Sequence, residues 1–157
     1  MFTLRPATSQ DEAIIRDLVN AARINPTGLD WRRFVVASLT GGEIIGCGQV
    51  KPHKDGSREL ASIVVAQHWR GNGVASAIIE HLMAANPGPL YLTCRSGLGP
   101  FYEKFDFRVV GESEMTPYFR RLSRLIKAIG FVALGPEEVL VMLRNSEAGS
   151  GNSENII

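Results

Sequence analysis

Apolar residues recur along this chain in two spacings, one typical of strands and one typical of helices. Short runs of alternating or β-branched apolar residues predict seven strands, at residues 2–7, 34–39, 43–50, 59–65, 90–94, 107–110 and 139–143. Apolar residues at every third or fourth position predict helices that end near residue 23 and cover 74–85 and 117–129, and a short helix is expected within 97–104. Interleaved strands and helices predict one α/β domain over residues 1–144, in three layers around a mixed sheet. The polar composition of residues 145–157 predicts a tail without a core role.

The segment 59–85 combines a predicted strand with a glycine-bracketed helix start. Gly71 and Gly73 precede the helix, and Arg70 adds a permanent positive charge beside them. The first turn of a helix has unpaired N–H groups and a partial positive charge, and glycine lets an anion approach them closely. This arrangement predicts a site for a polyanion.

Two common phosphate-binding motifs do not match this segment. Ser76 stands where a dinucleotide fingerprint has its third glycine, and no carboxylate occurs about 20 residues further on, around residues 92–94. The Gly-Lys-Ser/Thr of a P-loop is also absent.

A different pair of motifs does match. The first is Arg-x-x-Gly-x-Ala at residues 70–75, and the second is Phe-Tyr-x-x-x-x-Phe at residues 101–107. With both motifs in this order, the chain resembles the GNAT acyltransferase superfamily over most of residues 2–143. The resemblance implies a GNAT-like sheet whose fourth and fifth strands splay apart, with acetyl-coenzyme A bound in the gap.

The resemblance also implies roles for individual residues. The backbone around the fourth strand and the glycine turn would bind the cofactor, with the Val65 N–H directed at the thioester oxygen. Tyr102 would protonate the departing sulfur, since a phenol stays protonated at neutral pH. Glu59 is the candidate base, acting directly or through a water, and His53 is a rival for that role. The implied cofactor-binding residues are Ile63, Val64, Val65, Arg70, Gly71, Asn72, Gly73, Val74, Ala75 and Ser76.

Strand alternation adds an expectation about the fourth strand, because successive side chains point to opposite faces. It places Glu59, Ala61, Ile63 and Val65 on one face.

The chain departs from the superfamily pattern at two positions. Arg95 stands where many members have an asparagine, and a cation there is suited to a coenzyme A phosphate or an acidic substrate. Asp106 replaces the glycine of the second motif, and Asp enters the left-handed backbone region more readily than most residues.

By the same resemblance, residues 25–31 and 111–119 would select the acceptor. Trp31, Tyr118 and Phe119 either form an aromatic wall there or belong to the core. The arginines of residues 117–129 are interpreted as the solvated face of a core-packed helix, rather than as a membrane or nucleic-acid element.

Composition narrows the class of protein further. A net charge of +1 argues against a general nucleic-acid binder. No segment has a signal-peptide pattern or the apolar length of a membrane span, so we expect a cytoplasmic protein without a membrane partner. Cys47 and Cys94 lack motif spacing, so buried thiols are expected, with neither a disulfide nor a metal site.

The resemblance to the GNAT superfamily implies an acyl-coenzyme A-dependent N-acetyltransferase that acts by direct attack of a primary amine in a ternary complex. A non-catalytic acyl-coenzyme A-binding sensor or scaffold is the alternative, and an enzyme for longer acyl chains is a third hypothesis. The acceptor amine, whether a small molecule or a peptide, stays open. A homodimer is common in the superfamily, and the sequence leaves the oligomeric state open as well.

Overall fold

A mixed seven-stranded sheet forms the middle layer of the computed structural model, which describes residues 1–133 and 137–145. The strands are β1 (Phe2–Pro6), β2 (Phe34–Leu39), β3 (Ile44–Pro52), β4 (Arg58–Val65), β5 (Leu90–Arg95), β6 (Arg108–Val109) and β7 (Val139–Arg144). The longer helices are α1 (Glu12–Ala21), α2 (Val74–Ala85), α3 (Gly99–Glu103) and α4 (Pro117–Ala133). The predicted α/β class, sheet and helices are therefore confirmed. Helix α4 continues past Gly130, which was expected to end it, and most of the expected polar tail lies outside the described residues.

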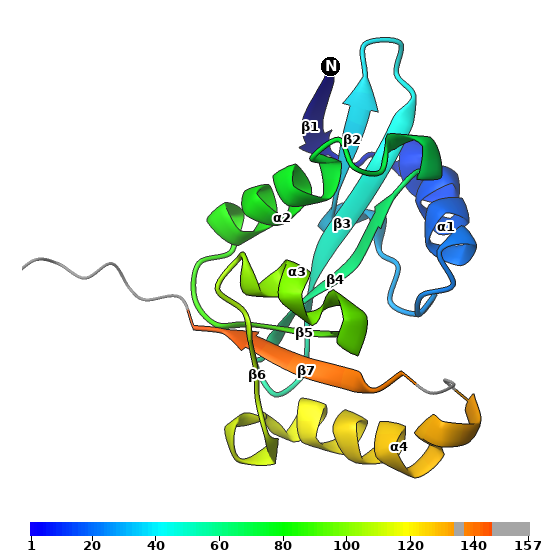
Figure 1. The fold of residues 1–157 in the computed structure, drawn as a ribbon. Coiled ribbons are helices and arrows are strands. Elements are labelled where there is room, and N and C mark those ends of the chain that lie inside the picture. Colours follow the sequence, from blue (N-terminus) through cyan, green and yellow to red (C-terminus); the bar gives the residue numbers. More distant parts are fainter. Residues whose placement is uncertain (134–136, 146–157) are drawn as a thin grey trace, which may run out of the picture.

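The strand order is β1-β2-β3-β4-β5-β7-β6, and neighbouring strands are antiparallel except β4 and β5. Helix α2 connects these two strands, which explains their parallel direction. Their pairing is confined to Glu59 opposite Tyr91, and beyond this point the strands diverge (Figure 1). The sheet is therefore open in its centre.

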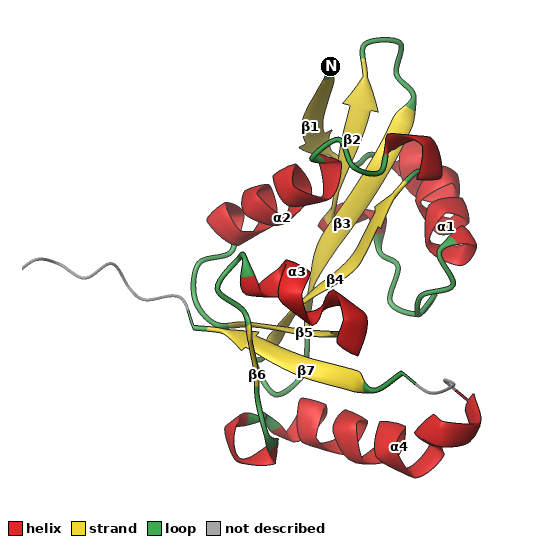
Figure 2. Ribbon diagram, in the orientation of Figure 1, coloured by secondary structure: helices red, strands yellow, loops and turns green. Residues whose placement is uncertain are grey.

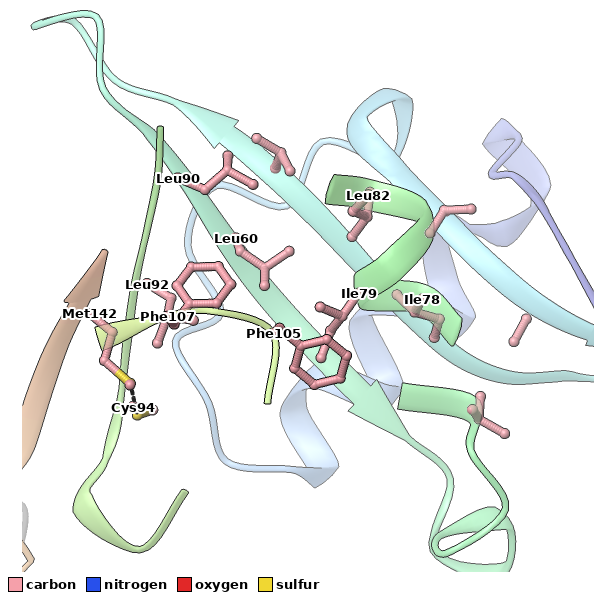
Figure 3. Close-up of a cluster of buried hydrophobic side chains, with 14 of the residues drawn as sticks. Leu60, Ile78, Ile79, Leu82, Leu90, Leu92, Cys94, Phe105, Phe107 and Met142 are labelled. Carbon is pink, nitrogen blue, oxygen red and sulfur yellow. Dashed lines mark hydrogen bonds between the residues drawn. The ribbon is translucent and has the colours of Figure 1, made fainter. Parts of the chain in front are cut away.

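Each face of the sheet is covered by two helices (Figure 2). One face packs against α2 and α3 through a cluster that includes Leu60, Ile79 and Phe105 (Figure 3). On the other face, α1 packs through Ile15 and Val19, and α4 packs through Phe119. Cys47 and Cys94 are both buried free thiols, as expected. Among the described residues, no helix is both long and apolar enough to cross a membrane.

A β-bulge in β4 changes which side chains face which layer. Ser62 has a φ of 57°, and the β3–β4 register shifts between Cys47 and Gln49. Ile63 and Val65 consequently pack on the α2 side, whereas Glu59 lies on the α4 side and contacts His53. The expectation that Glu59, Ile63 and Val65 share one face is therefore wrong, because the extra residue in the bulge inverts the alternation.

Gly48 lies opposite this bulge. A Cβ on Gly48 would stand 2.6 Å from Ile63 Cδ1 and 2.7 Å from Ile78 Cγ2, so only glycine leaves room for these side chains. The β3 glycine therefore lies both at a bulge and at a close approach of neighbouring side chains.

Candidate acyl-carrier site

A cavity of about 570 Å³ lies where β4 ends, α2 begins and α3 approaches. It is lined by nine of the ten residues expected to bind the cofactor, together with Tyr102: Ile63, Val64, Val65, Arg70, Gly71, Gly73, Val74, Ala75 and Ser76. Tyr102 belongs to α3, whereas Ala22, which also lines the cavity, follows α1 on the opposite face of the sheet. The cavity therefore reaches from one face of the open sheet to the other.

Asn72 is the expected residue that does not line this cavity. Its side-chain amide donates to the backbone oxygens of Trp69 and Arg70, each at 3.2 Å. Asn72 thus stabilises the turn itself.

The turn before α2 presents bare main chain to the cavity. Gly71 and Gly73 have φ values of 80° and 78°, in the left-handed region that glycine adopts most readily. The first backbone hydrogen bond at the start of α2 runs from Ala77 N to Gly73 O, at 3.1 Å. The N–H groups of the first turn, residues 74–76, lack partners inside the helix and are available to an anion.

Arg70 adds charge at the rim of this turn. It is exposed, and its Nε lies 3.4 Å from the backbone oxygen of Val65. Arg70 lines the same cavity as the residues of this turn, so its positive charge adds to their attraction for an anion.

The backbone of Val65 faces the gap between β4 and β5. The neighbouring Ala66 N–H donates to Ile45 O of β3 at 2.8 Å. Because successive N–H groups of a strand point to opposite edges, the Val65 N–H is directed away from β3. It is therefore free to pair with an extended ligand in the gap.

Tyr102 lines the cavity from α3, with its ring edge-on to those of Phe101 and Phe107. Burial, with a smaller contribution from Cys94, raises the pKa of Tyr102 to about 12. The phenol is consequently protonated at neutral pH and is a hydrogen-bond donor to the cavity.

Asp106 has a φ of 67° just after α3. The aspartate thus occupies the left-handed position where the second motif normally has glycine, and Phe107 N still donates to Tyr102 O at 3.4 Å. The end of α3 therefore keeps its conformation with aspartate in place of glycine.

Glu59 is not among the residues that line the cavity. It is buried, and its Oε1 lies 2.9 Å from His53 Nε2. Through its pairing with Tyr91, Glu59 stands at the closed end of the gap between β4 and β5, on the face opposite α2 and α3. The two rival candidates for the base are therefore hydrogen-bonded partners.

The other expected acceptor-side residues are spread over the fold. Phe119 is fully buried and stacks on Tyr91 at 4.5 Å, whereas Tyr118 stacks on His53 at 3.6 Å. Trp31 packs near α1, with the Arg32 guanidinium 4.8 Å from its ring centroid. Tyr118 and Phe119 also meet edge-on at 4.9 Å and share one hydrophobic cluster, whereas Trp31 belongs to another. Arg95 is exposed, and its guanidinium lies 3.7 Å from the Glu137 carboxylate.

The loop between α1 and β2 is fastened to the sheet by two side chains of β3. Gln49 Nε2 donates to Gly28 O at 3.2 Å and to Ser62 Oγ at 2.9 Å, and Lys51 Nζ donates to Thr27 O at 3.0 Å. Gln49 thereby connects this loop to the bulge of β4. No sequence motif indicated this role of Gln49, because it depends on contacts between segments that are distant in the chain.

Four further residues line the cavity without having been expected from the sequence: Ala22, Trp69, Leu98 and Phe101. Trp69 directly precedes the first motif and Phe101 is the first residue of the second motif, so both could have been proposed from the sequence. Ala22 has no such signal, because only the packing of α1 brings it to the cavity. Among the described residues, no group of three or more His, Cys, Asp or Glu side chains is arranged to hold a metal ion.

Comparison with known proteins agrees with this geometry. A family model described as acetyltransferase (GNAT) domain matches residues 30–109. No curated protein sequence matches the chain. All the structural relatives described next are below 20% identity, so their likeness concerns the fold.

N-acetylglutamate synthase from Neisseria gonorrhoeae, complexed with coenzyme A and N-acetyl-glutamate, has a TM-score of 0.73 and 15% identity. That match covers 94% of this chain and 35% of the synthase, so the chain spans about a third of that relative. The ribosomal-protein-S18-alanine N-acetyltransferase of Escherichia coli has a TM-score of 0.66 and 16% identity, over 97% of this chain and 98% of that one. Ard1 from Thermoplasma volcanium has a TM-score of 0.64 and 13% identity, over 93% and 98%.

Proposed function

Because the chain belongs to the GNAT acetyltransferase family, we propose that it transfers an acetyl group from acetyl-coenzyme A to a primary amine by direct attack in a ternary complex. The observation that carries this proposal is the cavity, which joins a bare main-chain turn to a half-buried phenol and reaches both faces of the sheet. Such a passage lets a donor enter from one face and an acceptor from the other.

The turn before α2 would hold the diphosphate of the donor. The N–H groups of residues 74–76 and the Arg70 guanidinium supply hydrogen bonds and positive charge, and the glycines leave the approach clear. The extended pantetheine arm would run along β4 as an additional strand. In this arrangement Val65 N–H donates to the thioester oxygen and stabilises the charge that develops on it.

Tyr102 would give its proton to the departing sulfur. Its raised pKa, of about 12, keeps the phenol protonated over the working pH range. The attacking nitrogen loses a proton as its bond to the acyl carbon forms, and this proton restores the phenol through solvent. Positioned proton transfer of this kind contributes about 10²–10⁴ in rate.

Glu59 would accept the proton that an acceptor ammonium must lose before attack. Its place outside the cavity lining favours transfer through water over direct contact. The acidic side chain stands on the face that the donor does not occupy, which supports entry of the acceptor from that face.

The named relatives suggest two classes of acceptor for a first panel. One was crystallised with N-acetyl-glutamate, and another is named for the alanine of a ribosomal protein. The panel therefore contains glutamate, a peptide beginning with alanine, a lysine-containing peptide, a polyamine and an aminoglycoside.

Calorimetric titration with acetyl-coenzyme A, followed by thiol release in the presence of each amine, tests the proposal. We expect saturable binding and amine-dependent thiol release above the amine-free blank. Ligand at about 100 times its Kd should stabilise the fold by about 2.7 kcal/mol. Binding without turnover of any amine would favour a sensor or scaffold, and absence of both heat and thermal stabilisation would reject the acyl-carrier site.

A further inference from the structure

His53 and Glu59 form a buried ionisable pair that the cavity does not include. Their side chains are each 11% exposed, and His53 Nε2 lies 2.9 Å from Glu59 Oε1. The His53 ring packs against two aromatic rings: it stacks on Tyr118 with 3.6 Å between ring centroids and meets Phe119 edge-on at 5.5 Å. The imidazole is therefore fixed in orientation as well as in distance.

The hairpin that carries His53 is hydrogen-bonded to the start of α4, which carries Tyr118. Asp55, in the hairpin between β3 and β4, accepts a hydrogen bond from the Tyr118 N–H at 2.9 Å. This bond ties the start of α4 to the hairpin that carries His53. The β3–β4 hairpin and the start of α4 are thus joined around the His53–Glu59 pair.

The outer atoms of the pair remain open. Within the described part of the chain, Glu59 Oε2 and His53 Nδ1 make no hydrogen bond, and neither atom is among those sealed from solvent without a partner. The pair is joined through its inner atoms while its outer atoms can exchange protons with water. Its place at the closed end of the β4–β5 gap, where Glu59 is opposite Tyr91, brings it to the acceptor side of the proposed reaction.

We propose that His53 is the positioning residue of the proton acceptor, holding Glu59 ionised and oriented toward the incoming amine. This inference rests on the proposed function. The Nε2–H donates to Oε1 and stabilises the carboxylate, since a hydrogen bond to a charged form favours that form. The acceptor ammonium gives one proton through water to Oε2 and becomes the neutral amine that attacks. The proton leaves for solvent after the product departs.

Lys51, Tyr118 and Asp55 are further ionisable groups near the pair. Lys51, opposite Glu59 on β3, has its pKa lowered mainly by burial. The pKa of Tyr118 is raised by burial, and that of Asp55 is lowered mainly by the Ser57 hydroxyl hydrogen bond. Tyr118 therefore stays neutral and Asp55 stays ionised around neutral pH.

The test is the pH dependence of kcat/KM for the best amine of the panel, in the full chain. His53→Phe keeps an aromatic ring against Tyr118 and removes Nε2, and we expect kcat/KM to fall about 10-fold to 100-fold. The acidic limb should move to higher pH, because the carboxylate loses the donor that favours its charged form. His53→Gln should recover part of the activity, since its amide N–H can donate to Oε1. His81→Gln, at an exposed position of α2, is the matched control and should behave as wild type.

Two measurements separate positioning from a structural role. The double variant His53→Phe/Glu59→Gln should be no slower than Glu59→Gln alone, because both changes remove the same function. A folded His53→Phe with the wild-type profile, or losses that multiply in the double variant, would overturn the proposal.

The pair can also be tested without turnover. NMR titration of the three histidines should show Glu59→Gln moving the His53 transition and leaving those of His68 and His81 in place. An unmoved His53 transition overturns the pair even if no amine is a substrate. Failure of the proposed function would instead appear as a wild-type protein that neither binds acetyl-coenzyme A nor releases thiol.

Discussion

Replacing Gly73 by alanine tests the main-chain turn at the start of α2. Gly73 has a φ of 78°, and a Cβ there meets no atom within 4 Å, so the substitution fits sterically but strains the backbone. An L-residue in this region costs about 1–2 kcal/mol. For a domain of this size, each 1 kcal/mol lowers Tm by about 2–4 °C. A modest loss of stability is therefore expected from the backbone alone.

Gly73→Ala should also weaken the binding of acetyl-coenzyme A, which backbone strain alone would not do. The new methyl group would stand in open space beside the N–H groups of the first turn, where the diphosphate is proposed to bind. Hydrogen bonds to a charged group contribute about 1.5–3 kcal/mol each. Weakening one of them should raise the Kd for acetyl-coenzyme A about tenfold or more.

Gly42→Ala is the matched control. Gly42 has a φ of 90° and equally open surroundings, but it lies in the turn between β2 and β3, away from α2 (Figure 1). Both variants should lose similar stability in thermal unfolding, and only Gly73→Ala should lose affinity in calorimetric titration. Wild-type affinity in Gly73→Ala, or equal weakening in both variants, would refute the proposed binding role of this turn.

Two further predictions concern catalysis and stability. Tyr102→Phe should lower kcat about 100-fold or more, with little change in the KM for acetyl-coenzyme A, because only the proton donor is removed. Wild-type thiol release by this variant would exclude the phenol from the reaction. Asp11 is buried and receives two hydrogen bonds from Arg5, at 2.8 and 3.1 Å, which contribute most to lowering its pKa to about 2. The lowered pKa of Asp11 stabilises the fold above about pH 4, and this contribution is lost as the pH falls toward 2. Asp11→Asn should therefore lower the free energy of unfolding, measured in urea, by up to about 2 kcal/mol at pH 7 and by less at pH 3. An equal loss at both pH values would contradict this assignment.

Local sequence features predicted the parts of the site that lie close together in the chain. The apolar spacing and flanking residues of α2 gave its bounds, Val74–Ala85, because a glycine start and an Asn-Pro end are local signals. The same signals identified the turn that lines the cavity. Tyr102 was singled out by its motif, and it is one of the residues that line the cavity.

Contacts between distant segments were not predictable in this way. Ala22 lines the cavity only because α1 packs across the sheet, and the His53–Glu59 bond depends on how the hairpin folds over β4. The left-handed conformation of Ser62 has no signature in its residue type, so the face assigned to Ile63 from alternation was wrong. The location of aromatic residues was equally hard to predict, since the sequence alone does not distinguish a core position from a pocket position for Phe119.

The bulge of β4 explains how one cavity reaches both faces of a sheet. In a regular strand the residues near the gap would alternate without interruption, and their neighbours on β3 would keep the strands in register. Here the extra residue at Ser62 lets Ile63 occupy the space that Gly48 leaves empty, while Val64 packs toward α1 and Val65 toward α2. Residues from both layers then meet at the end of β4, where β5 has already diverged. A missing side chain on one strand and an additional residue on the next are thus two parts of the same local structure, and the passage through the sheet depends on both.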